Sequence, residues 1–162
     1  MLRQSRALHG LVAWARTLVV AGIVVAADQI TKQLVADHVD RHEPIELVFG
    51  FEISNVRNSG IAFGLLEGAS DAVVLVLTLG ALGLLIAYFA AHARRPELWL
   101  PIGLVAGGAL GNLADRVRIG AAIDFIDPPL WPAFNLADIA IVAGVLMFVA
   151  LLLTDEAHGA PG

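Results

Sequence analysis

The chain has 162 residues, 58% of them hydrophobic, and a mean hydropathy of +0.79, which is too apolar for a soluble domain of this length. The net charge of −5, without a basic patch, excludes nucleic acid as a partner, and the lack of cysteine excludes disulfides and thiol catalysis. The five histidines are scattered without metal-ligand spacing, so we expect no metal and no other cofactor. The composition predicts one small membrane domain covering residues 1–162.

Four apolar stretches predict an all-α membrane protein with four transmembrane helices. They are residues 11–30, 72–91, 98–113 and 136–153. A helix needs roughly 20 apolar residues to cross the hydrocarbon core. The third and fourth stretches are short unless they extend through Asn112 and Asn135. Barrel strands would alternate in polarity, which this sequence does not do, so helices must satisfy the backbone in lipid.

Basic residues predict the orientation of these helices. Arg3 and Arg6 precede the first stretch, and residues 94–95 between the second and third are both arginine, so the positive-inside rule places both termini in the cytoplasm. Arg116 and Arg118, in the third connection, argue the other way. Residues 1–27 also have the outline of a cleavable signal peptide, an alternative that would leave three spans.

The two connections that then face outward carry most of the remaining polar sequence. Residues 45–57 alternate loosely between β-branched or aromatic and polar side chains, interrupted by Gly50, which predicts one or two short strands. We interpret residues 124–132 as a rigid, aromatic connection at the membrane surface. The expected fold is therefore a helical membrane protein with a small extracytoplasmic region that contains β-structure.

Asp115 and Asp138 stand at the edges of the third and fourth apolar stretches, and each follows an asparagine by three residues. An ionisable residue at membrane depth is by default a candidate functional residue. The outward connection brings these two helix ends to one depth, and two neighbouring carboxylates do not both ionise easily, so one can act as base and one as acid. The simpler alternative is that Asp138 caps its helix and Asp115 pairs with a neighbouring arginine.

Other polar and small residues have simpler interpretations when taken singly. Asp28 and Lys32 are spaced as an i,i+4 salt bridge. The segment Asn58-Ser59-Gly60 could be only a turn, and Ser59 has no evident histidine partner for nucleophilic catalysis. Glycines at four-residue spacing in the third stretch predict close helix packing; they are Gly103, Gly107, Gly108 and Gly111.

Taken together, five blocks resemble the lipoprotein signal peptidases, or type II signal peptidases, in order and spacing. The blocks are DQITK (28–32), NVRNSGIAFG (55–64), GGALGNLADR (107–116), GAAIDFI (120–126) and FNLAD (134–138). Ala122 departs from the larger β-branched residue that is usual there. The resemblance implies an aspartic endopeptidase of the bacterial inner membrane that cleaves diacylglyceryl-modified prolipoproteins on the amino side of the lipidated cysteine.

The resemblance also implies roles for particular residues. It implies a catalytic dyad of Asp115 and Asp138 near the extracytoplasmic face, and a supporting or substrate-binding set made up of Asp28, Lys32, Asn58, Gly60, Asn112, Arg116 and Asn135. The expected partners are lipid-modified prolipoproteins and membrane lipids, and the enzyme is expected to be a monomer. A proton channel or transporter, or a structural membrane protein, are the alternatives from other classes.

Overall fold

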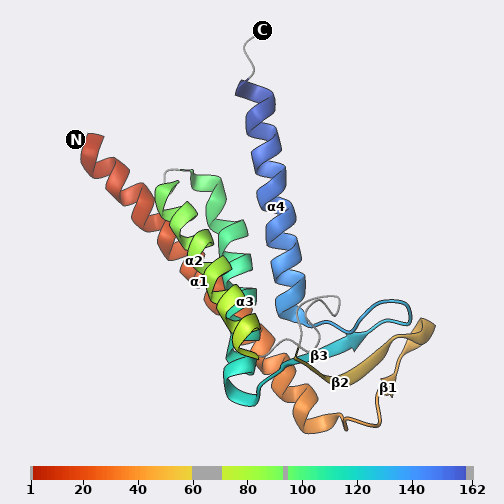
Figure 1. The fold of residues 1–162 in the computed structure, drawn as a ribbon. Coiled ribbons are helices and arrows are strands. Elements are labelled where there is room, and N and C mark those ends of the chain that lie inside the picture. The colour runs from red at the N-terminus through yellow and green to blue at the C-terminus, as the bar shows by residue number, and fades with distance from the viewer. Residues whose placement is uncertain (1, 60–70, 93–94, 160–162) are drawn as a thin grey trace.

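The fold is given by a computed structural model, which describes residues 2–59, 71–92 and 95–159. Within these ranges the long elements are four helices, of which the first runs down the molecule and the last returns (Figure 1). They are α1 (Leu2–His38), α2 (Asp71–Ala91), α3 (Trp99–Ile119) and α4 (Leu136–Gly159). Helices α1, α2 and α4 contain the first, second and fourth predicted apolar stretches, while α3 begins one residue after the start of the third and extends beyond residue 113 to include Asp115.

Length and composition qualify two of these helices as candidate membrane spans. The candidate segments are Gly10–His38 and Leu136–Thr154, and Leu75–Ala91 is a shorter apolar helix. Many of the large apolar side chains on these helices are exposed, including Leu18, Val76 and Leu146. Outward-facing apolar side chains are expected where the solvent is lipid, since burial against other helices is not needed there.

Glycine allows α3 to approach the helices on both sides of it. A Cβ atom added to Gly107 would lie 2.8 Å from the backbone oxygen of Ala21 on α1. One added to Gly108 would collide with the backbone oxygen of Ala137 on α4. The close packing predicted from the glycine spacing is therefore present, and it places α3 between the helices that carry Asp28 and Asp138.

A three-stranded antiparallel sheet lies at one end of the helices, in the order β1-β2-β3. The strands are β1 (Ile45–Glu46), β2 (Glu52–Asn58) and β3 (Ala122–Asp127), with a 3-10 turn, η1 (Val48–Gly50), between the first two. The strands predicted within residues 45–57 are thus present, with the interruption at Gly50. The connection interpreted as rigid and aromatic at 124–132 begins within a strand that the sequence analysis did not predict, because β3 pairs with β2 and aligns Asp124 with Val56.

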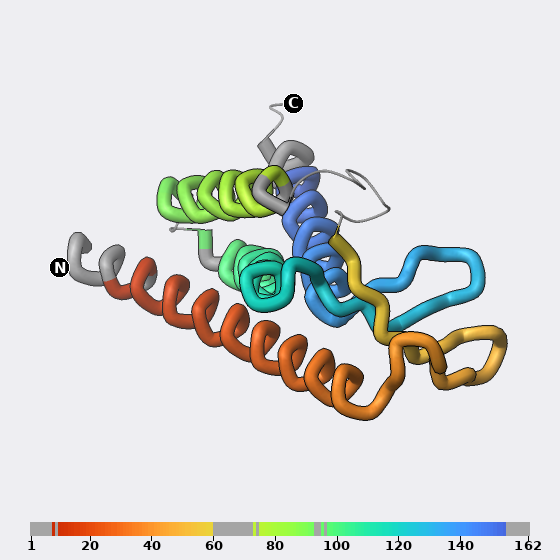
Figure 2. Tube along the Cα trace, turned by 60° about the horizontal axis from the view of Figure 1, so that its bottom comes forward, coloured from red at the N-terminus to blue at the C-terminus, as the bar shows by residue number. Residues whose placement is uncertain are grey.

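The sheet packs where α1 and α3 end and α4 begins, and it extends sideways from there (Figures 1 and 2). Val35, Val39 and Phe125 form a small core between the end of α1 and β3, and Leu136 at the start of α4 packs against it. This core fixes β3 against the helix ends. The polar residues of these segments are consequently brought together under the sheet.

Candidate active site

Asp138 is held at the start of α4 by the residue that precedes the helix. Asn135 accepts a hydrogen bond at its Oδ1 from the Asp138 backbone N–H (3.0 Å), and Asp138 Oδ2 accepts one from the Asn135 backbone N–H (3.1 Å). This reciprocal pair has the geometry of a capping box, which explains the Asn-x-x-Asp spacing. The other carboxylate oxygen, Oδ1, accepts from Asn112 Nδ2 on α3 (2.8 Å). Asp138 is therefore both a helix cap and a fixed carboxylate.

Asn135 links Asp138 to a third aspartate, Asp124 on β3. The Asn135 Nδ2 group donates to Asp124 Oδ1 (2.7 Å) and to Asn112 Oδ1 (2.9 Å). Asn58 on β2 donates through its Nδ2 to the second oxygen, Asp124 Oδ2 (2.8 Å). Strand β2, helix α3 and the residue before α4 thus each contribute an amide group that orients the carboxylates of Asp124 and Asp138.

The environment of Asp124 favours its protonated form. The residue is 2% exposed, and this burial raises the pKa of the Asp124 carboxyl to about 6. The negative charge of Asp138 raises the pKa further, while the amides of Asn58 and Asn135 oppose the shift. Asp124 lies in the 120–126 block but was not singled out as a site residue. The signal that could have found it is a carboxylate between Ile123 and Phe125, in a short apolar run typical of a buried strand.

Asp115 belongs to a different group, a fully buried ion cluster between α1 and α3. Lys32 Nζ lies 2.8 Å from both Asp28 Oδ2 and Asp115 Oδ2, and all three side chains are 0% exposed. Asp115 Oδ1 accepts from Gln29 and from Arg118, each at 3.0 Å, and its Oδ2 also accepts from the Ile123 backbone N–H. The Asp115 carboxylate is therefore saturated with donors. Gln29, which the sequence analysis passed over, is one of them.

The ion cluster supports the rest of the site through two further hydrogen bonds. Lys32 Nζ donates to Asn112 Oδ1 (2.7 Å), which directs the Asn112 amide nitrogen toward Asp138. Asp28 Oδ1 accepts from the backbone N–H of Ala137 in the first turn of α4 (3.0 Å). The simple i,i+4 pair expected for Asp28 and Lys32 is present, and it also connects α1 to the other two helices.

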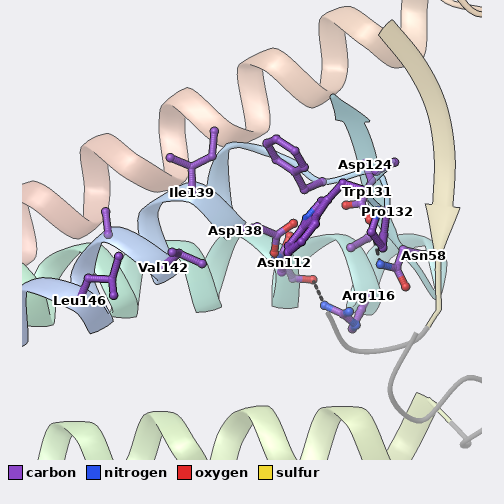
Figure 3. Close-up of a pocket in the computed structure, with 14 residues that line it drawn as sticks. Asn58, Asn112, Arg116, Asp124, Trp131, Pro132, Asp138, Ile139, Val142 and Leu146 are labelled. Carbon is purple, nitrogen blue, oxygen red and sulfur yellow. Dashed lines mark hydrogen bonds between the residues drawn. The ribbon is translucent and has the colours of Figure 1, made fainter. Parts of the chain in front are cut away.

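A cavity of about 430 Å³ opens beside these carboxylates, and Figure 3 shows the residues around it. At its polar end lie Asn58, Asn112, Arg116, Asp124 and Asp138, which come from β2, α3, β3 and α4. The rest of the wall is apolar, with Ile139, Val142 and Leu146 along α4 and residues 131–134 from the segment before α4. Among the described residues that line this cavity, the carboxylates are Asp124 and Asp138.

A second cavity of about 340 Å³ lies between α2, α3 and α4 and reaches the same polar group. Asn112, Arg116 and Asp138 line both cavities, while Leu82, Leu85 and similar side chains form the apolar remainder of the second. Arg116 donates from Nη1 to the backbone oxygen of Asn112 (3.4 Å). Two apolar spaces therefore converge on one set of polar side chains.

The structure brings most of the predicted site residues into one region, where they form two separate groups: those at the cavity and those in the ion cluster. Asn58, Asn112, Arg116 and Asp138 line the cavity, and Asn135 lies buried behind it. Asp28, Lys32 and Asp115 form the ion cluster away from the cavity. Gly60 lies outside the described residues. In the part of the chain that the structure describes, no group of three or more His, Cys, Asp or Glu side chains could hold a metal ion.

Long apolar helices joined to a buried carboxylate site under a small sheet define a helical membrane enzyme. The family model for signal peptidase (SPase) II matches residues 20–154, and the chain belongs to this family. The prediction made from the five sequence blocks is thereby confirmed, as is the predicted removal of signal peptides from prolipoproteins by a membrane enzyme.

Individual relatives agree with this family. The lipoprotein signal peptidase of Pelotomaculum thermopropionicum is 43% identical, over 85% of this chain and 91% of that protein. That of Moorella thermoacetica is 42% identical, over 84% and 91%. A bacterial membrane enzyme solved by the in meso method at 2.3 Å resolution is 31% identical and superposes with a TM-score of 0.81, over 90% of this chain and 92% of that one.

Proposed function

We propose that this chain is an aspartic endopeptidase that cleaves diacylglyceryl-modified prolipoproteins on the amino side of the lipidated cysteine, with Asp124 and Asp138 as its catalytic pair. The observation that carries the pairing is that these two carboxylates line one cavity and share Asn135 as a donor. This replaces the pairing of Asp115 with Asp138 expected from the sequence. Asp115 lies in the ion cluster, where Lys32 and Arg118 compensate its charge.

The proposed chemistry uses the two carboxyl groups in opposite protonation states. Asp138, ionised, takes a proton from a water molecule whose oxygen attacks the scissile carbonyl carbon, and Asp124, protonated, gives its proton to the carbonyl oxygen. In the second step the carbon–nitrogen bond breaks. Asp138 then gives its proton to the departing amine of the cysteine, and Asp124 recovers one from the hydroxyl that becomes part of the new carboxylic acid. The raised pKa of Asp124 supports its assignment as the acid.

The apolar walls of the two cavities are evidence for the proposal that the substrate carries lipid. Val142 and Leu146 extend the cavity along α4, away from the carboxylates. Acyl chains or apolar signal-peptide residues gain free energy from burial on such a surface, at roughly 25 cal/mol per Å². The second cavity offers a separate apolar space at the same polar group, so the two apolar parts of the substrate need not compete for one groove.

The decisive experiment is incubation of the purified full-length protein with a diacylglyceryl-modified prolipoprotein, followed by intact mass measurement. Asp124→Asn and Asp138→Asn should each lower the rate by about 10²-fold or more, since each removes a proton-transfer group. Asp127→Asn, at the end of β3 and outside the cavity wall, is the matched control and should cleave normally. If folded Asp124→Asn keeps near-normal turnover while folded Asp115→Asn has none, the pairing expected from the sequence is right instead.

We further propose that all four helices cross the bacterial inner membrane, with both termini in the cytoplasm and the sheet on the outer side. At 1.5 Å per residue the 21 residues of α2 and of α3 each extend about 31 Å, which matches a hydrocarbon core of about 30 Å. The close packing of Gly107 on α3 against Ala21, which lies upstream of Asp28, supports an uncleaved α1. One chain supplies both catalytic carboxylates, which supports action as a monomer and as a single domain.

Cysteine labelling in spheroplasts tests this orientation, because the chain contains no cysteine. Glu43 and Glu97 are both exposed and lie at opposite ends of the helices, so each can be replaced by cysteine. An impermeant thiol reagent should label the Glu43→Cys variant and spare the Glu97→Cys variant. The reverse pattern would place the site at the cytoplasmic face and would contradict the proposed topology.

A further inference from the structure

The far end of the sheet carries large apolar side chains that the proposed chemistry does not use. Val48 and Phe49 in η1 are 72% and 91% exposed, and Leu130 and Trp131 in the connection from β3 to α4 are 95% and 56% exposed. We call these four residues the apolar tip. Exposed apolar side chains gathered in one place usually mark a surface that contacts a partner or a membrane.

The two loops that form the apolar tip lie next to each other. A Cβ atom added to Gly50 would lie 3.6 Å from the Pro129 side chain, so η1 and the β3–α4 connection are in contact. Neither residues 47–51 nor residues 128–133 include a charged side chain. Phe49 has a φ of 61°, a left-handed conformation that a bulky residue rarely adopts. The backbone is thus held in an unfavourable conformation with its aromatic ring almost fully exposed.

The position of the apolar tip relates it to the lipid-facing surface of the helices. The sheet extends sideways from the end of the helices where α4 begins, roughly across their long axes (Figures 1 and 2). The exposed apolar face of α4 starts at Ile139 and continues at Val142, directly after that end. A tip that projects sideways at this level lies beside the helix bundle at the depth where hydrocarbon gives way to headgroups.

We propose that the apolar tip inserts into the interfacial layer of the same bilayer leaflet. Phenylalanine, leucine and valine gain free energy from leaving water, and tryptophan is enriched at membrane–water interfaces. The absence of charged side chains in both loops favours lipid over a protein partner, since it leaves few groups to specify such a partner. Because Trp131 also lines the cavity, insertion would hold that wall against the membrane, so that the cavity opens toward lipid.

Depth-dependent fluorescence quenching tests this inference without any activity measurement, so its outcome is independent of the proposed function. Phe49→Cys and Leu130→Cys variants of the full chain are labelled with an environment-sensitive fluorophore and placed in vesicles of phosphatidylethanolamine and phosphatidylglycerol. Glu43→Cys, which is exposed in the charged stretch before β1, is the matched control. Quenching is measured with aqueous iodide and with lipids that carry a nitroxide on the upper part of the acyl chain.

Both tip probes should show blue-shifted emission, strong quenching by the nitroxide lipid and little quenching by iodide. The control probe should show no blue shift, little quenching by the nitroxide lipid and strong quenching by iodide. Tip probes that behave like the control would overturn the inference, because the tip would then lie in water. Tip probes shielded from both quenchers would also overturn it, since they would indicate burial against protein, such as a second copy of this chain.

Discussion

Replacement of Lys32 by methionine should destabilise the protein far more than loss of any exposed charge. The Lys32 ammonium contacts Asp28, Asp115 and Asn112 at 2.7–2.8 Å, and its side chain is 0% exposed. Removal of one partner from a buried ion pair costs about 3–5 kcal/mol. Asp28 keeps its bond from Ala137 and Asp115 keeps its bond from Arg118, so we expect the low end, about 3 kcal/mol.

Thermal unfolding in detergent, followed by the fluorescence of the three tryptophans, measures this loss. For a chain of this size about 3 kcal/mol corresponds to a fall in Tm of roughly 6–12 °C. Arg118→Met is the matched control, because it removes the other cation of Asp115 but at a side chain that is 54% exposed. Its cost should be about 0–1 kcal/mol. Equal shifts for the two variants would refute the view that burial of Lys32 makes its ion pairs indispensable.

Three further predictions concern pH, packing and metal dependence. The pKa of Asp124 is raised to about 6, so its carboxyl group holds a proton below that pH and loses it above. The value of kcat/KM should therefore fall as the pH rises above about 6. A kcat/KM that does not change with pH in this range would contradict the role of Asp124 as the acid. Gly107→Ala should lower stability by about 1–3 kcal/mol in an unfolding titration, because its Cβ would meet the α1 backbone, whereas Gly22→Ala, with open space around it, should not. EDTA should leave the cleavage rate unchanged, because asparagine amides already occupy the oxygens of Asp124 and Asp138; inhibition reversed by zinc would show that a metal takes part.

The helices and the presence of Asp138 in the site could be predicted because both depend on local sequence. Apolar stretches of helical length and the Asn-x-x-Asp capping pattern each lie within a few turns of one helix. Local sequence patterns could not show in the same way which neighbouring helix the Asp115 carboxylate faces. Asn112 and Asp115 share one face of α3, but α3 packs between two other helices, and a shift of three residues turns the carboxylate from α4 toward α1. Its partner Lys32 lies far away in the sequence.

Asp124 illustrates the same limit for a strand. Its burial depends on the register of β3 against β2, which aligns Asp124 with Val56 across a large separation in sequence. In the sequence, β3 runs directly into Pro128 and Pro129, which favoured a rigid connection over a paired strand. Strand pairing of this kind is set by tertiary contacts, so local propensity alone does not predict it.

The arrangement of the ion cluster also bears on how the chain enters the membrane during synthesis. An isolated charge near the middle of an inserting helix costs roughly 2.5–3.5 kcal/mol. Here each acid has a cation on its own helix: Lys32 follows Asp28 by four residues on α1, and Arg118 follows Asp115 by three on α3. We expect that each of these two acids therefore leaves the translocation machinery with a compensating cation already on its own helix. The contact between Lys32 and Asp115 need form only afterwards, when α1 and α3 pack together.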